Sequence, residues 1–198
     1  MATDTRERII SASAELFRRQ GYAGTGIKQI VATAQAPFGS IYHHFPGGKE
    51  QIGAETIRVS GAFYGLLIDA VIDPAPDLIT GVRDFFAGAA VHVRESDYAD
   101  ACPIATVALE VASTNEVLRA ATDEVFESWL GAFCERLREA GIDAASARVI
   151  SLQILSLLEG AFILCRTTRS TEALDAAGEA AVVAVAAGLR TAAQEHGR

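Results

Sequence analysis

The sequence has few cysteines, no long uncharged apolar run and no apolar segment at its start. Its three cysteines, Cys102, Cys134 and Cys165, are widely spaced and odd in number, which excludes a clustered metal site and a disulfide framework. The uncharged apolar runs at 149–158 and 180–189 are shorter than the roughly 18 residues that a membrane helix needs. These absences predict a cytoplasmic protein that holds no metal or other cofactor and does not enter a membrane.

The chain carries a net charge of −8, which argues against a protein that coats nucleic acid along its whole surface. The charge is divided unevenly along the sequence. Residues 1–52 contain six basic and four acidic side chains, whereas the remainder contains 11 basic and 21 acidic ones. Only the N-terminal part is therefore expected to attract phosphate groups.

The first 45 residues show the pattern of three short helices. Apolar side chains recur at helical spacing before Gly21, a residue that suits a helix C-terminus, and Pro37 suits the first turn of another helix. The predicted helices are residues 5–20, a short helix that begins at Thr25 or Gly26, and a third from Pro37 to about His44.

Helical patterns continue through the rest of the chain, and no segment has a convincing strand pattern. The Pro74–Pro76 segment, Gly141 and a polar turn at 167–170 separate the helices. The predicted helices cover residues 49–72, 77–94, 103–112, 115–140, 143–166 and 171–194. The sequence thus predicts an all-α fold with a three-helix N-terminal domain, 1–47, and a larger helical domain, 48–198.

The segment from Gly21 to Ile52 resembles the helix-turn-helix of the TetR family of transcriptional regulators. The family pattern is matched at Gly21, Tyr22, Thr25, Ile27, Ile30, Ala34, Gly39, Ile41, Tyr42, His44, Phe45 and Lys49. Departures include Gly26 for a hydroxyl residue, Val31 for alanine, Gln35 for the turn glycine, Ala36-Pro37 for Val-Ser, and one additional residue before Lys49. The segment APFGSIYHHFPGGKEQ is similar to the branch of lincomycin-resistance and multidrug repressors.

This resemblance implies a set of DNA-contacting residues. Thr25, Tyr42, His44 and Lys49 would touch the DNA backbone or brace that contact, Pro37, Phe38, Ser40 and His43 would face the bases or the groove wall, and Lys28 is added for its charge. The expected recognition helix contains no Arg, Lys, Asn or Gln for bidentate base contacts, so we expect Pro37 and Phe38 to contact thymine methyl groups. A core position for Phe38 stays open.

The resemblance further implies a homodimer that binds a near-palindromic, double-stranded operator, with the last two helices forming the dimer interface. The residues expected in that interface are Leu155, Phe162, Ala177, Ala181 and Val185. The middle helices are expected to enclose a small apolar or aromatic ligand that releases the protein from DNA. The residues expected at the ligand are Phe63, Leu67, Phe86, Glu110, Trp129, Gln153 and Glu159.

Two other functions stay open. A regulator could respond to oxidation of Cys102, which precedes Pro103 at an expected helix start, or to a protein partner. A helical enzyme acting on an apolar substrate is disfavoured, because the sequence has no nucleophile–base pairing, glycine-rich phosphate loop or metal constellation. We therefore expect a ligand-responsive repressor rather than an enzyme.

Overall fold

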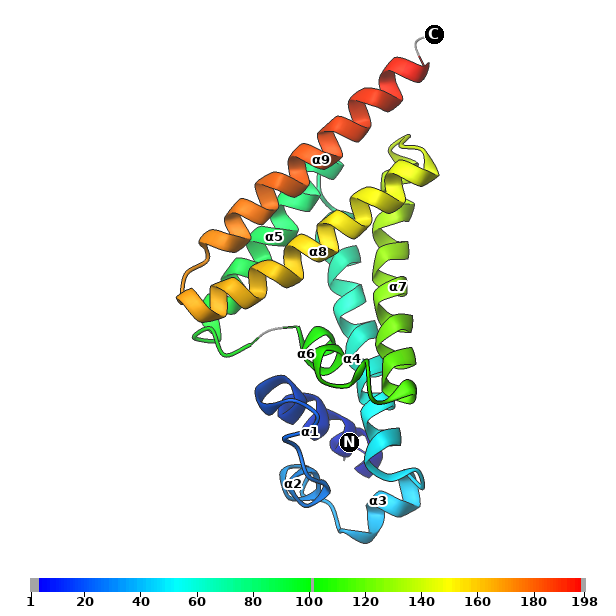
Figure 1. Ribbon diagram of the computed structural model, residues 1–198, viewed down its shortest axis with the longest axis vertical. Coiled ribbons are helices and arrows are strands. Elements are labelled where there is room, and N and C mark those ends of the chain that lie inside the picture. The colour runs from blue at the N-terminus through cyan, green and yellow to red at the C-terminus, as the bar shows by residue number, and fades with distance from the viewer. Residues whose placement is uncertain (1–3, 101, 197–198) are drawn as a thin grey trace. The chain divides into compact units, whose positions relative to one another are not determined.

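A computed structural model describes residues 4–100 and 102–196, and within these ranges the chain is helical and contains no strand. The predicted all-α class is thereby confirmed. The helices are α1 (Thr5–Gln20), α2 (Ile27–Thr33), α3 (Gly39–His44), α4 (Gly48–Ile72), α5 (Leu78–Glu95), α6 (Pro103–Val111), α7 (Glu116–Glu139), α8 (Ala144–Thr168) and α9 (Glu172–His196) (Figure 1).

Local capping interactions determine where several helices begin and end. The α1 helix ends at Gly21, whose φ of 74° is readily adopted by glycine and whose N–H donates to the Phe17 carbonyl at 2.9 Å. Asp77 accepts from the Thr80 N–H at 2.8 Å and so caps α5. Asp143 caps α8 in the same way. Because these signals are local, the helix ends lie within a few residues of those predicted.

The chain divides into two units, each described by itself. Unit 1 comprises residues 4–63 and 102–126, and unit 2 comprises residues 64–100 and 127–196. The α4 and α7 helices contribute to both. The predicted boundary between 1–47 and 48–198 separates functions rather than packing units and stays a prediction; residues 1–3 lie outside the described residues.

The core of unit 1 joins the three N-terminal helices to the start of α4. Ile9 of α1, Ile30 of α2, Ile41 of α3 and Ile52 of α4 are each 0% exposed and belong to one apolar cluster. Full burial of an isoleucine side chain contributes roughly 1.5–3 kcal/mol relative to an exposed one. The cluster therefore fixes α2 and α3 against α1 and α4.

The turn between α2 and α3 has an unusual backbone conformation. Gln35 has a φ of 49°, the left-handed region in which a non-glycine residue is strained. One guanidinium nitrogen of Arg8 donates to the Ala34 carbonyl at 3.2 Å and to the Gln35 carbonyl at 3.1 Å. Arg8 thus links α1 to the turn and helps to hold it in this conformation.

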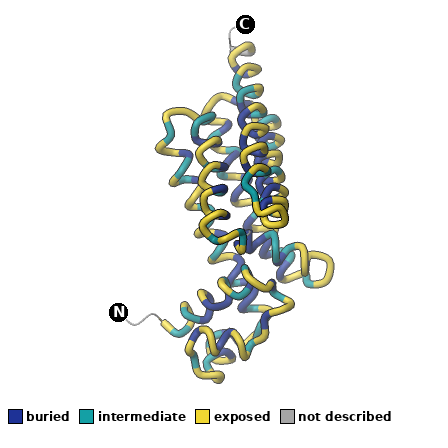
Figure 2. The backbone as a smooth tube through the Cα atoms, turned by 90° about the vertical axis from the view of Figure 1, so that its left-hand side faces the viewer, coloured by how far each residue is buried: buried dark blue, intermediate teal, exposed yellow. Residues whose placement is uncertain are grey.

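Unit 2 is built around α9, which packs along both α5 and α8 (Figure 1). Ile154, Ala181 and Val185 are fully buried in this packing. A Cβ atom at Gly178 would lie 2.9 Å from the Phe86 Cβ, so the small residue allows close approach of α9 to α5. In Figure 2 buried and exposed residues alternate along these helices, as expected for helices with one face toward a core.

The α8 helix is long and apolar enough to cross a membrane by length and composition, with a mean hydropathy of 1.7 over its most apolar window. The helix contains Arg148, Glu159 and Arg166, so the expectation that no charge-free apolar run reaches about 18 residues still holds. The helix is long and apolar enough only when its charged residues are averaged with the apolar ones. Helices that are apolar all round also form the interiors of globular proteins, and 39% of this window is buried. Composition alone thus does not make α8 a membrane helix.

Replacing Gln35 by glycine is expected to stabilise the protein by about 0.5–1 kcal/mol, because glycine adopts a positive φ without a steric penalty. Urea unfolding followed by circular dichroism measures the change. Ala32→Gly, at an exposed α2 position, is the matched control and should destabilise the protein by about 1 kcal/mol. A destabilised Gln35→Gly variant would show that the glutamine side chain itself holds the turn.

Candidate nucleic-acid interface

The short α3 helix has a buried inner face and an exposed outer face. Ile41 and Phe45 are 0% exposed, whereas Phe38 and Tyr42 are 50% and 56% exposed. The Phe38 and Tyr42 rings meet edge to face with their centroids 6.3 Å apart. The side chain of Phe38 therefore lies outside the core, where a molecule that binds the outer face of α3 can contact it.

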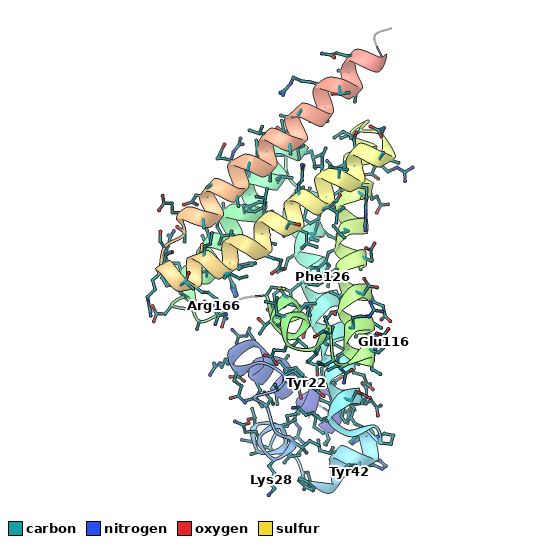
Figure 3. All side chains as sticks on the ribbon, in the orientation of Figure 1. Tyr22, Lys28, Tyr42, Glu116, Phe126 and Arg166 are labelled. Carbon is teal, nitrogen blue, oxygen red and sulfur yellow. The ribbon has the colours of Figure 1, made fainter. Side chains whose placement is uncertain are left out.

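The other residues expected at DNA from α2, α3 and the turn between them differ in exposure. Lys28, Pro37 and His43 are exposed, and Ser40 and His44 are half-buried. Figure 3 shows Lys28 and Tyr42 projecting at the same end of unit 1. The predicted surface thus gathers one lysine, two exposed aromatic rings and a histidine, with no carboxylate on α2 or α3.

Thr25 is in a different environment, because it is 1% exposed. Its hydroxyl donates to the Gly21 carbonyl at 2.7 Å and accepts from the Gln20 amide nitrogen at 3.1 Å. These bonds join the end of α1 to the start of α2. Of the two roles expected for Thr25, touching the DNA backbone or bracing that contact, the geometry favours the second.

Lys49 stands at the start of α4 and is half-buried. Its ammonium nitrogen lies 4.1 Å from the centroid of the Tyr22 ring, a cation–π contact. Burial lowers the pKa of Lys49 below its ordinary value, and the Glu110 carboxylate partly offsets this by favouring the charged form. Burial also raises the pKa of Tyr22, with a further contribution from Glu50. Lys49 is therefore engaged within unit 1 and is less available to a phosphate than predicted.

Glu110, expected at the ligand, instead contacts the loop between α1 and α2. One of its carboxylate oxygens accepts from the Ala23 N–H at 2.7 Å. A Cβ atom at Gly21 would lie 1.7 Å from the other oxygen, so this approach requires glycine at 21. The carboxylate is occupied by this contact, and we no longer assign it to a ligand. The pairing joins residues 87 positions apart, and no local sequence pattern identifies it.

The remaining residues expected at the ligand differ in how far they are exposed. On α4, Phe63 and Leu67 are 60% and 42% exposed, and Gln153 of α8 is also exposed. Phe86 and Trp129 are 1% and 6% exposed, and Glu159 is half-buried. Phe86 packs against Gly178 and Phe85 as a core residue. The exposed apolar side chains of α4 are thus better placed to meet an apolar molecule than the buried aromatic rings.

A small cavity in unit 1 has a volume of 10 Å³, close to the minimum for a single water molecule. None of the residues expected at the ligand lines it. Its lining comes from α1, α4 and α6 and comprises Ala14, Phe17, Thr56, Ile57, Ser60, Pro103, Ile104 and Val107. This cavity is therefore a packing defect rather than a binding site for an organic ligand.

Four of the five residues expected in a dimer interface are already buried within the chain: Leu155, Ala177, Ala181 and Val185, while Phe162 is half-buried. This corrects the expected contact residues, because side chains enclosed by their own unit cannot reach a partner. The exposed apolar side chains of the same two helices are Val149, Leu152, Ile163 and Leu164 of α8 and Val183 of α9. The apolar pattern of these helices did not distinguish the side chains that face their own unit from those that face outward.

Cys102 is the N-cap residue of α6, where its sulfur accepts from the Ala105 N–H at 3.4 Å, and it is 8% exposed. Such burial does not favour a thiol that reacts readily with oxidants. Within the described residues, the cysteines form no disulfide, and no group of three or more His, Cys, Asp and Glu side chains could hold a metal ion.

Comparisons with known proteins identify both parts of the chain. Residues 9–56 match the family of bacterial regulatory proteins called tetR, and residues 79–180 match the C-terminal domain of LmrA/YxaF-like transcriptional regulators. The HTH-type transcriptional regulator LmrA of Bacillus subtilis is 32% identical over 171 residues, 86% of this chain and 91% of that protein. YxaF of the same organism is 33% identical over 166 residues, 84% and 87% of the two chains.

Solved structures share the fold at lower identity. A TetR transcriptional regulator from Legionella pneumophila superimposes with a TM-score of 0.80 at 22% identity, over 91% of this chain and 97% of that one. A regulatory protein TetR from Rhodobacter sphaeroides gives the same TM-score and identity over 91% and 98%. The helical arrangement of this chain is therefore one that solved regulators adopt.

Substituting Thr25 by valine should lower the free energy of unfolding by about 1–2 kcal/mol, because the buried Gly21 carbonyl loses its donor. Thr33→Val, at an exposed threonine of α2, is the matched control and should change it by less than about 0.5 kcal/mol. Folded Thr25→Val protein should still bind DNA within a few-fold of the original chain. Unchanged stability with loss of DNA binding would instead make the hydroxyl a direct DNA contact.

Proposed function

Because this chain belongs to the TetR family of transcriptional regulators, we propose that it is a repressor that binds an operator through residues 1–47. The remaining helices form a homodimer and bind a small apolar ligand that releases the protein from DNA. The protein acts in the cytoplasm, where its operator lies. Enzymatic activity is not expected, since members of this family regulate transcription.

The observation that carries the proposal is the outer face of α3. Phe38 and Tyr42 are exposed there although both are large aromatic residues that normally seek burial. The sequence from residue 16 to residue 49 contains four basic side chains and no Asp or Glu, so phosphates meet no nearby carboxylate within this segment. A short helix with such a face suits insertion into the major groove of DNA.

Base recognition is proposed to rest on apolar contacts and DNA shape. The α3 helix has no Arg, Lys, Asn or Gln, so the usual bidentate contacts to guanine and adenine are not available from its own side chains. Pro37 and Phe38 would contact thymine methyl groups, while Ser40, Tyr42, His43, His44 and Lys28 would contact phosphates or the groove wall. An operator dominated by guanine contacts would contradict this assignment.

Dimer formation is proposed through the exposed apolar face of α8 and α9. Val149, Leu152 and Ile163 are separated by three and eleven residues, which places them on one stripe of α8. The inner face of α8 packs in the core of unit 2, and its outer face is apolar as well. An apolar outer face of this kind is typical of a surface that a partner covers, and we propose a second copy of the chain as that partner. Two copies would present two helix-turn-helix units to the half-sites of a near-palindrome.

Ligand binding is proposed to involve the exposed apolar side chains of α4. Val59, Phe63, Leu66 and Leu67 are all more than 40% exposed and lie near one side of that helix. The ligand must favour the non-operator conformation, typically by about 1–3 kcal/mol, for release to occur. Adding apolar compounds to the protein–operator complex tests for such release.

The proposal is tested by fluorescence anisotropy with DNA from upstream of the chain's own gene and with random DNA of equal length. Tyr42→Ala should weaken operator binding about fivefold or more, because a groove contact is lost. It should leave the unfolding free energy within about 0.5 kcal/mol, since the side chain is exposed. Val117→Ala removes an exposed apolar side chain of unit 1 outside the helix-turn-helix and is the control. Equal affinity for both DNAs would contradict the assigned function.

The dimer interface is tested by placing a charge on the α8 face. Ile163→Glu should shift the protein toward monomer in sedimentation experiments and weaken operator binding by at least about tenfold, because one half-site is lost per molecule. Val91→Glu in α5 alters a side chain of similar exposure and should remain dimeric. A dimeric Ile163→Glu protein would place the interface elsewhere.

A further inference from the structure

The Lys49 ammonium lies on one side of unit 1 rather than at the proposed DNA surface. It lies 4.1 Å from the Tyr22 ring centroid. Figure 3 shows Tyr22 on the side of the unit toward α6, set back from the end that carries Lys28 and Tyr42. To bind a DNA phosphate at that end, the flexible Lys49 side chain would therefore have to move away from the Tyr22 ring.

Tyr22 itself is held firmly by its neighbours. Its ring meets Phe17 edge to face at a centroid separation of 5.5 Å. A Cβ atom at Gly53 would lie 2.8 Å from the ring, so α4 approaches the ring closely. The aromatic platform beneath Lys49 is therefore fixed, and the lysine side chain is the part that can move.

Glu110 is held at the α1–α2 loop next to Tyr22, the residue whose ring Lys49 contacts. Its carboxylate is positioned by the Ala23 N–H at 2.7 Å and by the space that Gly21 leaves open. From there it favours the charged form of Lys49. The other nearby acid, Glu50, accepts from the Asn115 amide at 2.7 Å, which holds it toward the start of α7.

We propose that Glu110 sets the operator affinity of this protein by competing with a DNA phosphate for Lys49. In the free protein Lys49 rests on Tyr22 and is attracted by Glu110; on the operator it turns to a phosphate, while Glu110 keeps its bond to Ala23. This inference rests on the proposed function, because phosphate is the competing anion. It assigns to Glu110 a role in DNA affinity that the helix-turn-helix motif does not contain.

The resting position of Lys49 can be measured without DNA. The chain contains only two lysines, Lys28 and Lys49, so ¹³C labelling of lysine side chains gives two assignable ε-methylene signals in NMR spectra. The Lys49 signal should lie upfield of the Lys28 signal, because its protons lie over an aromatic ring. The shift should diminish in Glu110→Gln, and it should diminish in the original chain when operator DNA is added. The exposed Lys28 is the internal control.

The effect on affinity is measured by anisotropy titration at several salt concentrations. Glu110→Gln keeps an acceptor for the Ala23 N–H and should tighten operator binding about two- to fivefold, as expected for loss of one exposed charge attraction. Lys49→Met should weaken binding and lower the salt dependence by about one phosphate contact. In the Lys49→Met background, Glu110→Gln should have no further effect.

Glu116→Gln is the matched control, because it removes the same charge from an exposed glutamate of unit 1 that pairs with Arg119 instead of Lys49. Its effect should be smaller and the same with or without Lys49. The proposal would be overturned if Glu110→Gln still tightened operator binding in the Lys49→Met background. It would also be overturned if the NMR signals of Lys49 and Lys28 coincided. Failure of the original chain to prefer its operator would contradict the proposed function, while the NMR result in the free protein would stand separately.

Discussion

The proposed recognition of DNA depends on the burial of Ile41 and Phe45, which form the inner face of α3 and its C-terminal end. This helix has only six residues, too few to be stable in water by its own hydrogen bonds. Its position is therefore set by tertiary packing, and both side chains are completely enclosed by apolar residues of α1, α2 and α4. Because the inner face supplies the stability, the outer face is free to carry Phe38 and Tyr42 for recognition rather than for folding.

The orientation of α3 also depends on a turn that the local sequence does not favour. The helix-turn-helix pattern that this segment resembles has glycine at the position of Gln35, and the backbone of Gln35 nevertheless adopts a positive φ. Arg8 satisfies two carbonyls of this turn from α1. The conformation is therefore imposed by contacts from outside the turn, so that α1 helps to determine how α3 is presented.

Much of the fold could be predicted because its signals are local. Gly21 and Asp143 mark helix ends through their own conformation or hydrogen bonds, and they do so wherever the helices later pack. The faces of α8 could not be predicted in this way, because this helix is apolar on both sides and only packing decides that Leu155 is enclosed and Ile163 is not. The contact of Glu110 could not be predicted either, because Ala23, whose N–H donates to it, lies 87 residues away in the sequence.

The charge of the N-terminal segment explains its attraction to DNA, but it does not show which charged side chains of other segments lie close to it in the folded unit. The segment 16–49 is free of carboxylates, yet residues 102–126 of the same unit contain four acidic side chains and one arginine. Phosphate attraction is screened beyond about 8 Å at physiological salt, so the acid-free segment can attract DNA although the unit as a whole is not basic. Glu110 is the carboxylate that folding brings against the α1–α2 loop at the edge of this segment. Its position makes the balance between internal pairing and phosphate binding a property of the folded unit, one that the helix-turn-helix sequence alone does not encode.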